Sequence, residues 1–149
     1  MANIVPDSFK AELLAASHNF EYGVSAQTYK LALYVTTLGP PYTTSSTTYS
    51  TTNEVSSSGT GYTGGGNALT LGSLSGSVPG SNTAIVDFDN LTFSSVTLTA
   101  LGAAIYNTST TPANMLCLVL DFGGNKTATA GDFTIQFPSP TAADAIIRL

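Results

Sequence analysis

The stretch Thr28–Val35, which reads TYKLALYV, decides the fold of this chain. Large apolar side chains occupy every second position of it, at Tyr29, Leu31, Leu33 and Val35. A period of two places these four side chains on one face of a β-strand. The stretch therefore predicts a core strand with one strongly apolar face.

Beyond residue 67 the same period recurs in short segments separated by turn-forming residues. Pro79-Gly80, residues 87–90 and residues 123–126 mark such turns. Further strands are expected near residues 68–78, 83–89, 91–98, 101–106, 115–122, 133–137 and 145–149. About eight short strands predict an all-β fold, an antiparallel β-sandwich of jelly-roll type. Its expected core residues are Leu31, Leu33, Phe88, Phe93, Ile105, Leu118, Leu120, Phe133, Ile135 and Phe137.

Length and composition fit one domain over residues 1–149, since a chain of this size forms one hydrophobic core. The chain has 23 threonines and 17 serines but only 9% charged residues, against a usual value of about 25%. Threonine favours strands through its branched Cβ. Hydroxyl groups must therefore supply much of the surface polarity, and weak self-repulsion suits a protein that works docked to others.

One segment near the amino end has helical periodicity. Apolar residues recur at steps of four, three and four from Phe9 to Phe20. Asp7 or Ser8 can cap the amino end of such a helix. The sequence thus predicts a short accessory helix over residues 8–19 that packs on the β-domain.

Residues 37–67 form a long Ser/Thr/Gly-rich connection with almost no core-forming pattern. Loops of this length in compact domains are usually functional or mobile. Tyr42, Tyr49 and Tyr62 lie within it, and tyrosine offers a large amphipathic contact at low entropic cost. We expect these three tyrosines to form a protein-interaction surface.

Charge argues against nucleic acid and membrane partners. The net charge is −5, and the four cations, Lys10, Lys30, Lys126 and Arg148, are scattered, so no basic patch is expected. No stretch approaches the ~20 apolar residues of a membrane span, and the amino end lacks a signal-peptide pattern. The sequence predicts synthesis in a cytoplasm.

A literal G-x-G-x-x-G pattern occurs at Gly59–Gly64, with Asp87 further along the chain. A dinucleotide fingerprint needs an apolar strand before it and a helix after it. Serines 56–58 precede the pattern and residues 65–67 are Gly-Gly-Asn. A glycine-rich loop is the better interpretation, and no cofactor is expected.

The remaining chemical side chains do not form a recognisable set. His18 is the single histidine, with Glu21 three residues on, and a ring at a helix end is expected for it. Cys117 lies in an apolar strand and is expected to be a buried, unreactive thiol. Asp87 and Asp89 are expected to form a turn, with weak divalent-ion binding left open. No catalytic residue, metal ligand or enzyme activity is predicted.

Several blocks of sequence together resemble a family of small virion structural proteins of tailed bacteriophages. The blocks are FKAELL at 9–14, HNF at 18–20, YKLALY at 29–34, TNEV at 52–55, GTGYTGG at 59–65, VDFD at 86–89, AAIYN at 103–107 and FTIQFP at 133–138. The resemblance implies a role in the particle, as a capsid decoration or cement protein on the capsid surface. Its implied partners are the major capsid protein and further copies of itself, a trimer in preference to a dimer. The residues 43–52 depart from the family as a Thr/Ser-rich insertion.

Two other function classes stay open. One is a tail or neck component, including a receptor- or carbohydrate-binding module in which Tyr42, Tyr49 and Tyr62 stack on sugars. The other is a hydrolase, for which His18 is the single available imidazole base.

Overall fold

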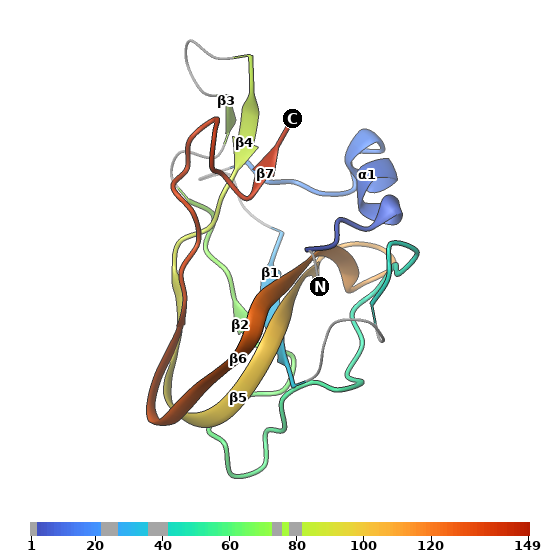
Figure 1. The fold of residues 1–149 in the computed structure, drawn as a ribbon. Coiled ribbons are helices and arrows are strands. Elements are labelled where there is room, and N and C mark those ends of the chain that lie inside the picture. Colours follow the sequence, from blue (N-terminus) through green and yellow to red (C-terminus); the bar gives the residue numbers. More distant parts are fainter. Residues whose placement is uncertain (1–2, 22–26, 36–41, 73–75, 78–81) are drawn as a thin grey trace.

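The computed structural model describes residues 3–21, 27–35, 42–72, 76–77 and 82–149, and it is an antiparallel all-β structure with one short helix (Figure 1). The elements are α1 Asp7–Leu14, β1 Tyr29–Tyr34, β2 Asn67–Ala68, β3 Gly76–Ser77, β4 Ala84–Val86, β5 Leu91–Asn107, β6 Met115–Ile135 and β7 Ile147–Arg148. One sheet has the order β2-β1-β5-β6 and the other the order β3-β4-β7. The predicted all-β class is confirmed, and the sandwich packing and the jelly-roll connection stay predictions.

The predicted short strands after residue 90 are parts of two long ones. Figure 1 shows β5 and β6 side by side as one long, curved ribbon. Segments 91–98 and 101–106 both belong to β5, and β6 contains the segment 115–122 together with residues 133–135 of the segment 133–137. Register shifts along the pair bend it, as β-bulges do.

The turn predicted at residues 123–126 is wrong, because these residues lie inside β6. Ala100 pairs with Lys126, whereas Gly102 pairs with Asp121, so residues 122–125 form a wide bulge opposite one residue of β5. Positive φ angles at Gly123 and Gly124 make the bulge possible. The glycines therefore deform a continuous strand instead of ending it.

Strand β1 is the centre of the larger sheet and is buried on both faces. Leu31 and Leu33 belong to the main apolar cluster, which extends from Phe9 of α1 to Ile147 of β7. The opposite face contributes Ala32 and Tyr34 to a second cluster, which includes Tyr42 from the segment after β1. The prediction of one apolar face was therefore incomplete.

Nine of the ten predicted core residues are buried. Leu120 is the exception: it is partly buried and packs against the main cluster. Phe93, Ile105 and Leu118 are among those at most 5% exposed. The prediction of the main core is confirmed.

Helix α1 ends earlier than predicted. Ala16 has a positive φ of 55°, and the amide of Ser17 donates to the carbonyl of Glu12, so the chain turns back after residue 15. Neither predicted cap forms: Pro6 is the N-cap, and the Ser8 hydroxyl donates to the carbonyl of Ser46.

The smaller sheet replaces three predicted strands with short pairings. Among the described residues of the segment 68–78, Gly76–Ser77 is strand β3 of this sheet, Ala68 belongs to β2 of the larger sheet, and Leu71 forms an isolated bridge with Phe88. The predicted Pro79-Gly80 turn and residues 37–41 of the long connection lie outside the described residues.

Among the described residues, no helix has the length and apolar character needed to cross a membrane.

Candidate functional site

Two of the three predicted contact tyrosines are in the core. Tyr42 is 1% exposed and Tyr62 is 3% exposed, so the expectation that they present their rings to a partner is wrong. Tyr49 is partly buried, and its ring stacks on Tyr106 of β5 with centroids 4.3 Å apart. Tyr42 and Tyr49 cover the second apolar face of the sheet, whereas the ring of Tyr62 belongs to the main apolar cluster.

Glu54 organises this covering segment. Its carboxylate accepts hydrogen bonds from the hydroxyls of Tyr49 and Tyr62, at 2.5 and 2.7 Å, and from the amide of Gly65 at 2.6 Å. The Tyr62 hydroxyl in turn accepts from the amide of Leu33 in β1 at 3.1 Å. One partly buried carboxylate thus ties three points of the loop to the central strand.

A second polar contact fastens the beginning of the segment. The hydroxyls of Tyr34 and Tyr42 are 2.7 Å apart, and Tyr34 donates to the carbonyl of Ser50 at 2.6 Å. The amide of Ser50 donates to the Tyr42 hydroxyl at 2.8 Å. The described part of the predicted loop, residues 42–67, is therefore held on the sheet at both of its ends.

Burial keeps these phenols protonated. It raises the pKa of Tyr62 far above its ordinary value, and the hydrogen bond to Glu54 raises it further. Burial, followed by the charge of Glu54, raises the pKa of Tyr106 to about 12. The tyrosines therefore remain neutral donors towards the carboxylate at neutral pH.

The glycine-rich pattern at Gly59–Gly64 is a loop, as expected. Gly59 and Gly61 have positive φ angles of 72° and 77°, and the described residues on either side form neither a strand before it nor a helix after it. The amide of Thr97 in β5 donates to the carbonyl of Thr60, which sets this loop beside the long ribbon.

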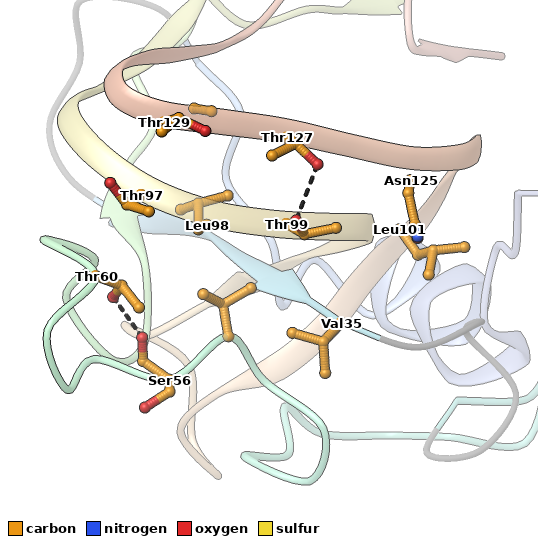
Figure 2. A pocket seen from close by; sticks show the side chains of 12 residues that line it. Val35, Ser56, Thr60, Thr97, Leu98, Thr99, Leu101, Asn125, Thr127 and Thr129 are labelled. Atoms are coloured by element: carbon orange, nitrogen blue, oxygen red, sulfur yellow. Dashed lines mark hydrogen bonds between the residues drawn. The ribbon is translucent and has the colours of Figure 1, made fainter.

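A groove of about 490 Å³ opens between this loop and the β5–β6 ribbon, and we call it the hydroxyl groove (Figure 2). Its lining residues are Val35, Val55, Ser56, Thr60, Thr97, Leu98, Thr99, Leu101, Asn125, Thr127, Ala128 and Thr129. Figure 2 shows the threonines of β5 and β6 on one side and Ser56 with Thr60 on the other. The groove combines an apolar floor with a rim of uncharged donors and acceptors.

Strand alternation explains this lining. In Thr97-Leu98-Thr99 the middle residue is buried in the main cluster, and in Thr127-Ala128-Thr129 the alanine packs against it. The flanking threonines therefore point away from the core. Thr99 and Thr127 are cross-strand partners whose hydroxyls lie 2.9 Å apart. The two Thr-x-Thr triplets are the sequence signal for the groove, and the prediction from the three tyrosines did not include them.

The groove is suited to binding. Its polar lining consists of serine, threonine and asparagine side chains, and none of the lining residues carries a charge. Hydroxyls and amides donate and accept hydrogen bonds without changing protonation state near neutral pH. This arrangement can recognise a polar, uncharged surface by hydrogen bonding over an apolar base.

His18 lies in a buried polar cluster beneath α1. Its Nε2 is 2.8 Å from Glu12, and its Nδ1 is 3.1 Å from the side-chain amide nitrogen of Asn107. Asn107 uses its carbonyl oxygen for the amide of Ser109, so its nitrogen is the donor to Nδ1. His18 is then the tautomer that donates from Nε2 to Glu12. The partner from the helix is therefore Glu12, whereas Glu21 is exposed.

Cys117 completes this cluster, with its sulfur 3.9 Å from Nδ1 of His18. Thiol, imidazole and carboxylate follow one another as in cysteine hydrolases. Cys117 is 0% exposed, however, and burial, followed by the charge of Glu12, raises the pKa of its thiol. The expectation of a buried thiol is confirmed, and the thiol is closed off from any substrate.

Asp87 is buried and accepts a hydrogen bond from the amide of Phe88 at 2.8 Å, and Asp89 is exposed. Among the described residues, no three His, Cys, Asp or Glu side chains gather closely enough to hold a metal ion.

Comparisons with protein-family models, with curated proteins and with solved structures found no match to this chain. The resemblance to phage virion proteins therefore stays a hypothesis based on the sequence blocks.

Proposed function

We propose that this protein is a structural protein of a bacteriophage particle that binds the outside of the capsid and stabilises it, without catalysing a reaction. The sequence resemblance supplies the viral context. The observation that carries the proposal is the hydroxyl groove, whose loop wall is held in place by the contacts of Glu54. We propose this groove, instead of the three tyrosines, as the docking surface.

A preformed groove suits this role for an energetic reason. A loop that is already ordered loses little conformational entropy when a partner binds. An uncharged rim also avoids the desolvation penalty of burying charges. The groove can therefore bind a coat-protein surface with little loss of conformational entropy and no charge desolvation from its own lining.

The proposed partner is the major capsid protein, and the proposed assembly is a homo-oligomer, a trimer before a dimer. Each copy that bridges coat subunits adds interface to the shell. Several engaged copies in one oligomer strengthen attachment through effective concentration. Internal pressure is then resisted by contacts that must break together.

A tail or neck module that binds carbohydrate is the second candidate. The hydroxyls and Asn125 of the groove offer hydrogen bonds to sugar hydroxyls. Stacking on Tyr42 or Tyr62 is excluded as its basis, because both rings are buried. Binding to a glycan array, lost on substitution in the groove, would favour this candidate.

The deciding experiment is rebinding of purified protein to capsids stripped of it, followed by heating. Thr129→Lys places a bulky charge in the groove, and Ser94→Lys places the same charge at an exposed position of β5 outside the lining. We expect Thr129→Lys to weaken rebinding at least tenfold and Ser94→Lys to leave it unchanged. Failure of the wild-type protein to rebind, or equal retention of the genome by stripped and decorated particles, would overturn the proposal.

A further inference from the structure

We infer that a second groove, between α1 and β7, binds an extended segment of a partner protein in which acidic residues alternate with apolar ones. This groove is separate from the hydroxyl groove and the inference does not depend on the proposed function. It has a volume of about 400 Å³ and is lined by Val5, Phe9, Lys10, Leu13, Leu118, Ile146, Ile147, Arg148 and Leu149. We call it the α1–β7 groove; the two elements that form its walls are labelled in Figure 1.

Exposed apolar surface is the first observation. Most of the lining is aliphatic or aromatic, yet Val5 is 42% exposed and Leu149 is 74% exposed. Leu14, at the end of the same helix, is 92% exposed. Large apolar side chains gathered at a groove mark interaction sites more often than single exposed ones do.

A free strand edge is the second observation. Strand β7 lies at the edge of its sheet among the described residues, paired on one side with β4. Ala84 and Leu149 exchange two backbone hydrogen bonds of 3.0 Å each, so Arg148 and Ile85 form the non-hydrogen-bonded pair of the ladder. The amide and carbonyl of Arg148 therefore point away from β4, and an added strand can pair with them.

Positive charge at the rim is the third observation, and it selects the partner. Lys10 and Arg148 are two of the four cations in a chain of net charge −5. Lys10 pairs with Asp7 at 3.0 Å, but both side chains are more than half exposed, and its ammonium group has two further donors. Arg148 is exposed, with no described side chain paired with it. Carboxylates on the incoming segment can bind these cations.

These three features favour a foreign segment over a second copy of this chain. Symmetric pairing of two β7 edges would place Arg148 of one copy opposite Arg148 of the other. Like charges directly opposite each other destabilise a strand pair. A strand with acidic and apolar residues from a different protein can pair with the β7 edge, pack against the apolar walls and bind the cations.

The test is selection of binders from a display library of random dodecapeptides on the immobilised full chain. The matched variants are the double substitution Lys10→Gln with Arg148→Gln, and Lys126→Gln, which removes an exposed cation outside this groove. Equal unfolding curves for all three proteins establish that these surface changes leave the fold intact. Backbone amide shifts of the ¹⁵N-labelled protein locate the bound peptide.

We expect the selected peptides to alternate acidic and apolar residues and to shift the amides of Val5 and Arg148. The double variant should bind them at least tenfold more weakly, and Lys126→Gln should bind them as the wild-type protein does. The inference is overturned by a selection without enrichment, by binders that lack acidic residues, by equal binding to the double variant, or by shifts confined to the hydroxyl groove. A concentration-dependent dimer of the wild-type protein that shifts the amides of Val5 and Arg148 would also overturn it, because a second copy would then occupy the groove.

Discussion

The hydroxyl of Tyr62 donates to the carboxylate of Glu54 at 2.7 Å and accepts from the amide of Leu33 at 3.1 Å. A side chain of the long polar connection thus completes the hydrogen bonding of the central strand. Because the same carboxylate also holds Tyr49 and Gly65, the connection is part of the folded core and not an appendage to it.

Substituting Glu54 by Gln should lower the free energy of unfolding by about 1.5–3 kcal/mol, the usual range for hydrogen bonds to a charged group. The new amide keeps one acceptor but turns an NH₂ group towards hydroxyl and amide donors. Urea unfolding measures the difference, and Glu21→Gln is the control because Glu21 is exposed. Equal stability of the two variants would mean that the Glu54 contacts contribute nothing.

Replacing either Tyr42 or Tyr62 by alanine should lower the free energy of unfolding by about 3–5 kcal/mol, as for other buried aromatic side chains. Both rings are at most 3% exposed, so their loss leaves cavities against the sheet. Thermal unfolding checks this. A change within about 0.5 kcal/mol, typical of surface positions, would restore these tyrosines as candidates for exposed contacts.

Two glycines of the same connection form a matched pair. A Cβ at Gly66 would lie 1.8 Å from the carbonyl oxygen of Leu31, whereas a Cβ at Gly59 would have no atom within 4 Å. Both residues have positive φ angles, so both alanine variants carry backbone strain of roughly 1–2 kcal/mol. Gly66→Ala should be far less stable than Gly59→Ala, because the strand must also move. Similar unfolding midpoints would contradict this account.

Cys117 should resist alkylation in the native protein and react promptly in denaturant. Its side chain is fully buried, and burial raises the pKa of the thiol, which lowers the reactive thiolate fraction. Mass spectrometry after iodoacetamide treatment measures the labelling. Fast labelling under native conditions would show that the cluster around His18 opens to solvent.

The sequence was sufficient to predict the central strand and the main core, because alternation over residues 29–33 reports burial directly. The length of β5 and β6 was not predictable, since Gly123 and Gly124 favour a turn and a bulge equally well. The local sequence shows where the backbone can bend, but it does not show with which strand the bent segment pairs.

The candidate site was harder to predict for a related reason. Tyr42 and Tyr62 are surrounded in sequence by serine, threonine and glycine, which give no period. Their burial depends on distant strands, because Tyr42 packs in the second apolar cluster and Tyr62 in the main one. Glu54 has no local signature either, because its donors come from residues 5, 8 and 11 positions away in an irregular segment. Only Thr97-Leu98-Thr99 and Thr127-Ala128-Thr129 carried a usable pattern, a hydroxyl face opposite an apolar one.

The protein should lose stability steeply as the pH rises above about 9–10. Burial raises the pKa of Tyr29, Tyr34 and Tyr62 far above the ordinary value of 10.0, and that of Cys117 above 9.0. In the unfolded chain these groups release protons at their ordinary pKa values, whereas the folded protein retains them. Above about pH 9–10 the unfolded state therefore binds fewer protons than the folded state, so the free energy of unfolding falls as pH increases. Below about pH 9 these groups are protonated in both states and do not change the free energy of unfolding.

The measurement is a titration to pH 12.5 that follows tyrosinate absorbance and circular dichroism together. We expect the buried tyrosines to ionise only when the β-sheet signal is lost, in one transition, whereas in guanidinium all tyrosines titrate near pH 10. Tyr106, whose pKa is raised to about 12, should ionise close to the unfolding transition. Full tyrosinate formation near pH 10 with an unchanged dichroism spectrum would contradict the burial of these rings, and with it the anchoring of the loop by Glu54.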